Sequence, residues 1–209
     1  MHSMGDVLTS EQEEAFHWRL KEARKAKDRG NVALEFGRRQ EDSKKLREAS
    51  FSYKKGCLLL TEYIPDTNES AGDSLQDMLV KRQAGARRHP LSEEQFAEVM
   101  ELYVALQKNL ALVNYFLGRH AEGVKCATTV LSISGHENDD KALLRRAHCN
   151  HCLGDLRAAE KDLNTLERLS KDGNVPIDSA VPDLRRQIAK TKQQALEKER
   201  KMCAKMFAQ

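Results

Sequence analysis

Residues 114–118, NYFLG, and residues 150–154, NHCLG, share the pattern N-x-x-L-G at an offset of 36 residues. Ala111 and Ala147 keep the same offset. A fixed period in this range predicts repeated helical units, because each unit can bury its apolar side only against its neighbour. Small residues such as these alanines allow two helices to cross closely. The sequence therefore predicts an all-α repeat fold.

The period resembles that of the tetratricopeptide repeat (TPR), a helix–turn–helix unit of about 34 residues. An insertion of about two residues near residues 135–138 accounts for the difference from that period. Gly118 and Gly154 are expected to end the first helix of each unit, since glycine adopts a positive φ at little cost. Gly123 and Ala159 are the corresponding small residues of the second helices.

A third, more degenerate unit is predicted upstream. Residues 23–36 have a helical pattern that contains Gly30 and Asn31, and the helix after them carries Tyr53 in the arrangement E-A-x-x-x-Y. Residues 37–45 predict a longer turn than usual between these two helices. A polar insertion follows this unit, and within it residues 74–83 have the pattern of a short helix.

Capping patterns support these boundaries. S-x-x-E at residues 10–13 is expected to open the first helix, and S-x-x-Q at residues 92–95 is expected to open the first helix of unit two. A basic helix from about Pro182 to Phe207 closes the array, where a solvated cap is required. The predicted order is a tail or expression scar (1–10), a TPR domain (11–177) with units at 11–62, 93–135 and 138–172 and an insertion at 64–91, and a C-terminal capping helix (178–209).

Composition limits the partners that the chain can be expected to have. The 209 residues include 35 Lys and Arg against 32 Asp and Glu, and this near balance does not favour nucleic acid. No apolar run reaches the roughly 18 residues of a membrane span, and the N-terminus lacks the apolar core of a signal peptide. The five cysteines are scattered rather than arranged as a disulfide framework, so a reducing, cytoplasmic setting is expected.

In stacked TPR units the first helices line a concave groove. Counting from the glycine of each unit places two pairs of polar residues on its walls, each pair spaced i, i+4 and therefore on one helix face. A single asparagine of unit two lies between the two pairs. The predicted peptide-binding residues are Lys27, Asn31, Asn109, Lys141 and Arg145.

This set resembles the carboxylate clamp of TPR co-chaperones, with K-x-x-G-N at residues 27–31 and K-x-x-x-R-R-A at residues 141–147. A peptide that ends in Asp carries two carboxylates, one on its side chain and one on its main chain. Cations and neutral amide donors at fixed spacing can hold both groups. Among the cations, Arg145 can bind a carboxylate with two parallel hydrogen bonds.

Residues 199–208, ERKMCAKMFA, resemble the closing helix of the large immunophilins, which are FKBP-type or cyclophilin-type prolyl isomerases with a C-terminal TPR module. Cys203 stands where that pattern has a tyrosine. The resemblance implies binding to the C-terminal EEVD peptide of heat-shock protein 90, or of heat-shock protein 70. It also implies an isomerase domain before the TPR module, but only a short segment precedes the first predicted helix. We therefore expect this chain not to be an enzyme.

Other interpretations were weighed against this one. The array could be a TPR scaffold for a different acidic or internal peptide, or a non-catalytic fragment of a prolyl isomerase. The basic last helix has the character of calmodulin-binding helices, but a capping helix explains it as well. Residues 148–152, HCNHC, contain C-x-x-C without a second pair, so we expect packing residues rather than a metal site, with Cys152 facing a neighbouring helix. No cofactor is expected.

Overall fold

The computed structural model describes residues 8–64, 91–173 and 178–207. In these ranges the chain consists of α-helices and one short 3-10 helix, and the predicted all-α class is confirmed. No helix there is long and apolar enough to cross a membrane. The elements in chain order are α1 (Ser10–Arg39), α2 (Ser43–Leu60), η1 (Thr61–Tyr63), α4 (Glu93–Phe116), α5 (His120–Leu131), α6 (Asp140–Leu153), α7 (Leu156–Lys171) and α8 (Ala180–Phe207).

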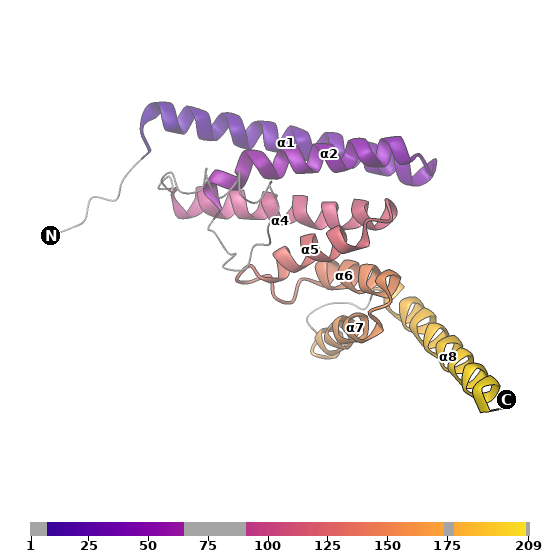
Figure 1. Ribbon diagram of the computed structural model, residues 1–209. Helices are drawn as coiled ribbons and strands as arrows, with labels where there is room; N and C mark the ends of the chain where they lie inside the picture. Colours follow the sequence, from indigo (N-terminus) through magenta and orange to yellow (C-terminus); the bar gives the residue numbers. More distant parts are fainter. Residues whose placement is uncertain (1–7, 65–90, 174–177, 208–209) are drawn as a thin grey trace.

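The helices stack as pairs in the order of the chain (Figure 1). Short turns join α1 to α2, α4 to α5 and α6 to α7, and each pair packs on the next through contacts of α2 with α4 and of α5 with α6. The first helices of the pairs also contact one another in series, α1 with α4 and α4 with α6. Residues on these three helices can therefore share one surface although they are far apart in the sequence.

The N-x-x-L-G segments end their helices with the same hydrogen bonds. The carbonyl of Asn114 accepts the N–H of Arg119 at 2.9 Å, and the carbonyl of Asn150 accepts the N–H of Asp155 at 2.9 Å. Gly118 and Gly154 lie at φ of 71° and 82°, as predicted. The sequence offset thus corresponds to a repeated local structure.

Apolar side chains form one buried cluster between α1, α2 and α4 and another between α6, α7 and α8. Phe16, Tyr53 and Leu106 are buried in the cluster that joins α1, α2 and α4. Leu163 and Leu184 are buried in the cluster that joins α6, α7 and α8. The core is therefore a series of helix–helix contacts, as the repeat pattern predicts.

The start of the first helix differs from the prediction. The capping box is formed by Thr9 and Gln12, with Thr9 Oγ1 accepting the N–H of Gln12 at 3.3 Å and Gln12 Oε1 accepting the N–H of Thr9 at 3.0 Å. Ser10 is already helical, so the S-x-x-E pattern at residues 10–13 was wrong by one position. The second predicted box, at Ser92 and Gln95, is confirmed.

The predicted long turn at residues 37–45 is also wrong. Helix α1 continues to Arg39, and the turn occupies only residues 40–42. Gly37 is a buried helical residue, and a Cβ there would lie 2.9 Å from Leu46 Cγ. This glycine therefore permits close packing of α2 on α1 rather than ending α1. The positive φ that the turn needs, 52°, is adopted by Glu41.

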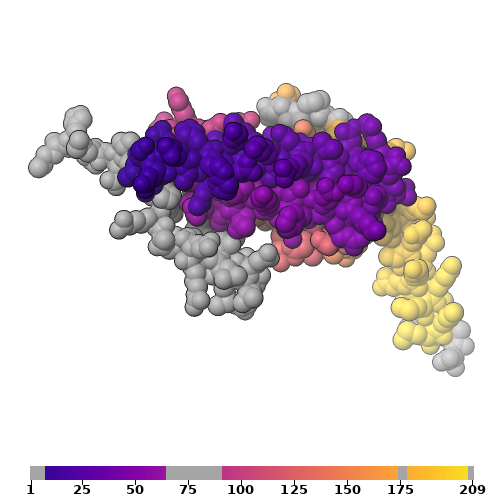
Figure 2. Space-filling model, turned by 90° about the horizontal axis from the view of Figure 1, so that it is seen from above, coloured from indigo at the N-terminus to yellow at the C-terminus, as the bar shows by residue number. Residues whose placement is uncertain are grey.

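Helix α8 begins at Ala180 and caps the array with its first turns only. Val181, Leu184 and Ile188 are buried against α6 and α7. Met202 and Met206, near the end of the same helix, are 65% and 75% exposed. The later turns extend away from the stacked pairs (Figure 2). The predicted short helix at residues 74–83 and most of the predicted N-terminal tail lie outside the described residues.

The crossing of α5 and α6 depends on Gly123. A Cβ there would lie 2.5 Å from Cys149 Sγ and 3.3 Å from the carbonyl oxygen of Ala111. We expect Gly123→Ala to lower the free energy of unfolding by about 1–3 kcal/mol through overpacking. Adding Cys149→Ala removes the sulfur and should recover part of that loss. Urea unfolding of both single variants and the double variant measures the coupling, and strictly additive losses would contradict this contact.

Candidate functional site

Two asparagines from different helix pairs meet on the surface shared by α1, α4 and α6. Asn31 Oδ1 accepts a hydrogen bond from Asn109 Nδ2 at 3.1 Å and another from the Tyr53 hydroxyl at 2.9 Å. Both bonds use the oxygen of Asn31, so its Nδ2 donors stay available to a ligand. Asn31 and Asn109 therefore lie next to each other, as predicted. Asn109 donates one of its two amide hydrogens to Asn31.

The Tyr53 ring is fully buried beneath this pair. Gly30 makes room for it, because a Cβ at that position would overlap the ring. Burial raises the pKa of Tyr53, and the nearby positive charge of Arg145 opposes that shift. The hydroxyl therefore stays protonated and donates to Asn31. Tyr53 was predicted only as a repeat residue, and its role in orienting Asn31 appears once α1 and α2 are packed.

Arg145 lies close enough to Asp139 for their charges to interact. Its Nη1 atom is buried, and in the described part of the chain it has no hydrogen-bond partner. Burial is the main cause that lowers the pKa of Arg145, and the positive charge of Arg38 contributes. An anion bound to this guanidinium would stabilise it, because leaving a buried donor without a hydrogen bond costs free energy.

Asp139, the acid whose charge affects Arg145 most, makes its hydrogen bonds to other groups. Asp139 Oδ2 accepts a hydrogen bond from Lys108 Nζ at 2.7 Å, and its Oδ1 accepts the N–H of Ala142 at 2.9 Å. This arrangement caps α6 and ties it to α4 next to Asn109. Both oxygens of the Asp139 carboxylate therefore accept hydrogen bonds that stabilise the fold.

The neighbouring arginine shows the opposite arrangement. Arg146 donates from Nε to Asp162 Oδ2 at 2.9 Å and from Nη2 to Asp162 Oδ1 at 2.7 Å. The Asp162 side chain is only 4% exposed. Arg146 therefore joins α6 to α7 inside the array, whereas Arg145 faces α1 and α4 without a bonded anion.

Lys27 and Lys141 complete the predicted set. Each lies one helical turn from a member of the cluster, Lys27 before Asn31 and Lys141 before Arg145. Lys141 is exposed and Lys27 half-buried, and their side chains make no hydrogen bond or ion pair with the described residues. Hydrogen bonds thus bring together Asn31, Asn109 and Tyr53, and Arg145 lies near enough to Tyr53 to affect its pKa, while helix geometry alone places the two lysines.

A pocket of about 530 Å³ opens beside the asparagine pair. It is lined by Asn31, Leu34, Glu35, Arg38, Arg39 and Asn109. Sequence reasoning did not include Arg38 in the site. A continued count along α1 would have found it, because residues 27, 31, 34 and 38 fall on one helix face.

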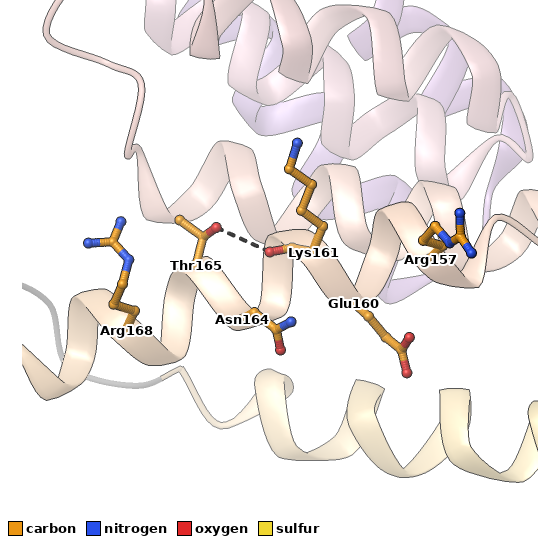
Figure 3. Close-up of a pocket in the computed structure, with 6 residues that line it drawn as sticks. All are labelled: Arg157, Glu160, Lys161, Asn164, Thr165 and Arg168. Carbon is orange, nitrogen blue, oxygen red and sulfur yellow. Dashed lines mark hydrogen bonds between the residues drawn. The ribbon is translucent and has the colours of Figure 1, made fainter.

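A second hollow of about 530 Å³ lies on the outer face of α7 (Figure 3). Two of its lining residues, Glu160 and Asn164, bond with α8. Lys192 Nζ donates to Glu160 at 2.6 Å, and Arg185 donates to Asn164 Oδ1 at 2.5 Å. None of the predicted clamp residues lines this hollow, and its side chains hold the last helix in place.

The residues of the HCNHC segment separate in the structure. Cys149 packs against Gly123, whereas Cys152 is exposed, so the prediction that Cys152 faces a neighbouring helix is wrong. Cys152 lies one turn after Cys149 on the same side of α6, but it belongs to the last turn of the helix, where it is exposed. Within the described ranges there is no group of three or more His, Cys, Asp or Glu side chains suited to a metal ion.

Comparison of the sequence with protein-family models yields no match, and comparison with curated proteins likewise yields none. The surface shared by α1, α4 and α6 is therefore the basis for inferring function. It carries a pair of bonded amides from separate helix pairs and a buried guanidinium donor that has no partner among the described residues.

The two adjacent arginines should respond oppositely to removal of charge. Arg146→Leu leaves Asp162 buried without a partner, so we expect a loss of about 3 kcal/mol in the free energy of unfolding. Arg145→Leu removes an unpaired buried cation, so we expect no loss, or a gain of up to about 2 kcal/mol. Chemical denaturation of the peptide-free protein measures both values. A loss at Arg145 as large as that at Arg146 would show that Arg145 is structural.

Proposed function

We propose that this chain is a three-unit TPR module that binds the acidic C-terminus of another protein through a carboxylate clamp. The observation that carries the proposal is Arg145, whose buried Nη1 has no partner within the described residues, while the nearby Asp139 is bonded to Lys108. The adjacent asparagine pair supplies neutral donors. Lys27, one turn before Asn31, and Lys141, one turn before Arg145, complete a set of donors suited to two carboxylates.

Each side chain of the clamp has a distinct chemical role. Arg145 can hold one carboxylate with two parallel hydrogen bonds, which sets its direction as well as its energy. Asn31 donates from Nδ2, and Tyr53 keeps that amide oriented. Lys27 and Lys141 add positive charge from opposite walls. A flexible peptide tail loses entropy when it is ordered, so we expect a dissociation constant on the order of micromolar.

The partner that fits the resemblance to co-chaperones is the EEVD tail of heat-shock protein 90, or that of heat-shock protein 70. The stacked helix pairs and the cap formed by α8 are consistent with a TPR array of the large-immunophilin type. We propose a cytoplasmic, non-enzymatic co-chaperone module, with any isomerase chemistry in another part of a parent protein. The five free cysteines are consistent with a reducing compartment.

A second candidate function is a scaffold for an internal acidic peptide segment. The exposed lysine at position 141 and the open pocket next to Asn109 would also accept acidic side chains from a chain that continues in both directions. The two candidates differ in one respect, because only the clamp requires a free main-chain carboxylate at the end of the peptide.

Titration with a peptide that ends in EEVD tests the proposal directly. Isothermal calorimetry should show micromolar binding, and amidation of the terminal carboxylate should weaken it by at least about tenfold, because a charged hydrogen-bond acceptor is lost. Equal affinity for the free and amidated peptides would reject the clamp and favour the scaffold. Binding should also weaken as salt is raised from low concentration.

Variants at the clamp residues test the assignment of the site. Lys27→Ala and Arg145→Ala should each weaken peptide binding by about 1–3 kcal/mol, as expected for lost charge-assisted hydrogen bonds. Lys21→Ala is the matched control, since Lys21 is an exposed lysine of α1 off the face that carries Lys27 and Asn31. Wild-type affinity in both test variants, or a loss of the same size in the control, would contradict the assigned residues.

A further inference from the structure

Helix α1 carries a row of groove-facing residues that extends beyond the predicted clamp. Lys27, Asn31, Leu34 and Arg38 follow spacings of four, three and four residues and share one face of the helix. The pocket beside the asparagine pair contains the last three of them. Arg38 therefore forms the far end of the surface that begins at the clamp.

The guanidinium of Arg38 is held in place by an aromatic ring from another helix. Its Cζ lies 5.1 Å from the centroid of Phe116, at the end of α4. A cation over a ring face keeps its N–H donors directed outward, where an anion can reach them. The contact orders a long side chain before any ligand arrives, which reduces the entropy lost on binding.

Arg38 has no bonded counter-ion among the described residues, although an acid lies close by. Glu35 lines the same pocket, but its Oε1 pairs with Arg39 Nη2 at 2.5 Å. Arg38 and Arg145 instead repel each other across the groove, and this repulsion contributes to the lowered pKa of Arg145. Two cations that face one surface without a shared anion favour an acidic ligand between them.

The separation of Arg38 from the clamp sets the spacing of the acidic groups in such a ligand. Seven residues of α-helix separate Arg38 from Asn31, which corresponds to about 10 Å along the helix axis. An extended peptide covers that distance in about three residues. An acid about three residues before the C-terminal residue would therefore reach Arg38 while the terminal carboxylates occupy the clamp.

We propose that Arg38 is a specificity-determining residue that binds an acidic side chain upstream of the peptide C-terminus. The ligand class is a C-terminal peptide whose terminal Asp is preceded, two to four residues earlier, by Glu or Asp. This inference rests on the proposed function, because the clamp provides the fixed end from which the spacing is measured. It adds a third carboxylate to the two that the clamp holds.

The test is a double-mutant cycle between protein and peptide. The peptides end in a free Asp and have acidic residues at the second, third and fourth positions before it, each replaced in turn by its amide. Binding to the wild-type protein, Arg38→Ala and Arg39→Ala is measured by calorimetry. Arg39→Ala is the matched control, since Arg39 lines the same pocket but is paired with Glu35.

We expect Arg38→Ala to weaken binding of the fully acidic peptide by about three- to tenfold, whereas Arg39→Ala changes it less than twofold. One amide replacement should weaken binding to the wild-type protein and have no further effect on Arg38→Ala. Thermal unfolding of Arg38→Ala should match that of the wild type, so that a loss of folding is not mistaken for a loss of contact.

The outcomes separate this inference from the proposed function. If amidation of the terminal carboxylate weakens binding but no replacement couples to Arg38, the inference is overturned and the clamp stands. If free and amidated peptides bind equally, or neither binds, the clamp fails and the inference fails with it. Coupling at any of the three positions supports Arg38 and identifies the acid that it contacts.

Discussion

The close approach of α1 and α2 at Gly30 is the contact on which the candidate site depends. The absence of a side chain there lets the ring of Tyr53 enter the core. The ring is fully buried, yet its hydroxyl reaches Asn31 on the groove surface. Asn31 in turn accepts the amide of Asn109, which links the first helix pair to the second. A packing constraint between two helices thus determines the orientation of polar groups that face a ligand.

Arg145 and Arg146 are adjacent in α6 but differ in how their charges are satisfied, and we propose a binding role for Arg145 alone. Arg146 satisfies its charge inside the protein with a buried carboxylate, which holds α6 on α7. Arg145 keeps a buried donor without a partner among the described residues, and leaving such a donor unpaired costs free energy. Sites that bind charged ligands commonly carry such a cost in the free protein. We therefore propose that this donor serves to bind the carboxylate of a ligand.

The groove is a product of the array and belongs to no single helix pair. Its residues come from α1, α4 and α6, which contact one another only because the pairs stack in order. The Lys108–Asp139 pair and the packing of Gly123 against Cys149 hold this order near the site. The first turns of α8 close the apolar end of the stack. The rest of α8 extends outward with its apolar residues exposed, so it contributes little to the core.

Local pattern by itself determined the all-helical class, the repeated helix ends at Gly118 and Gly154, and the candidate residues on each first helix. Those features depend on short-range hydrogen bonds and on the 3.6-residue period of the helix, and both are determined by residues that are close in the sequence. Gly37 was misread as a turn because a glycine that ends a helix and one that admits a neighbour look alike in sequence. Only tertiary packing decided that Tyr53 orients Asn31, that Arg145 is left unpaired and that Arg38 rests on Phe116. Each of these joins side chains from different helices, and their distances depend on how the pairs stack.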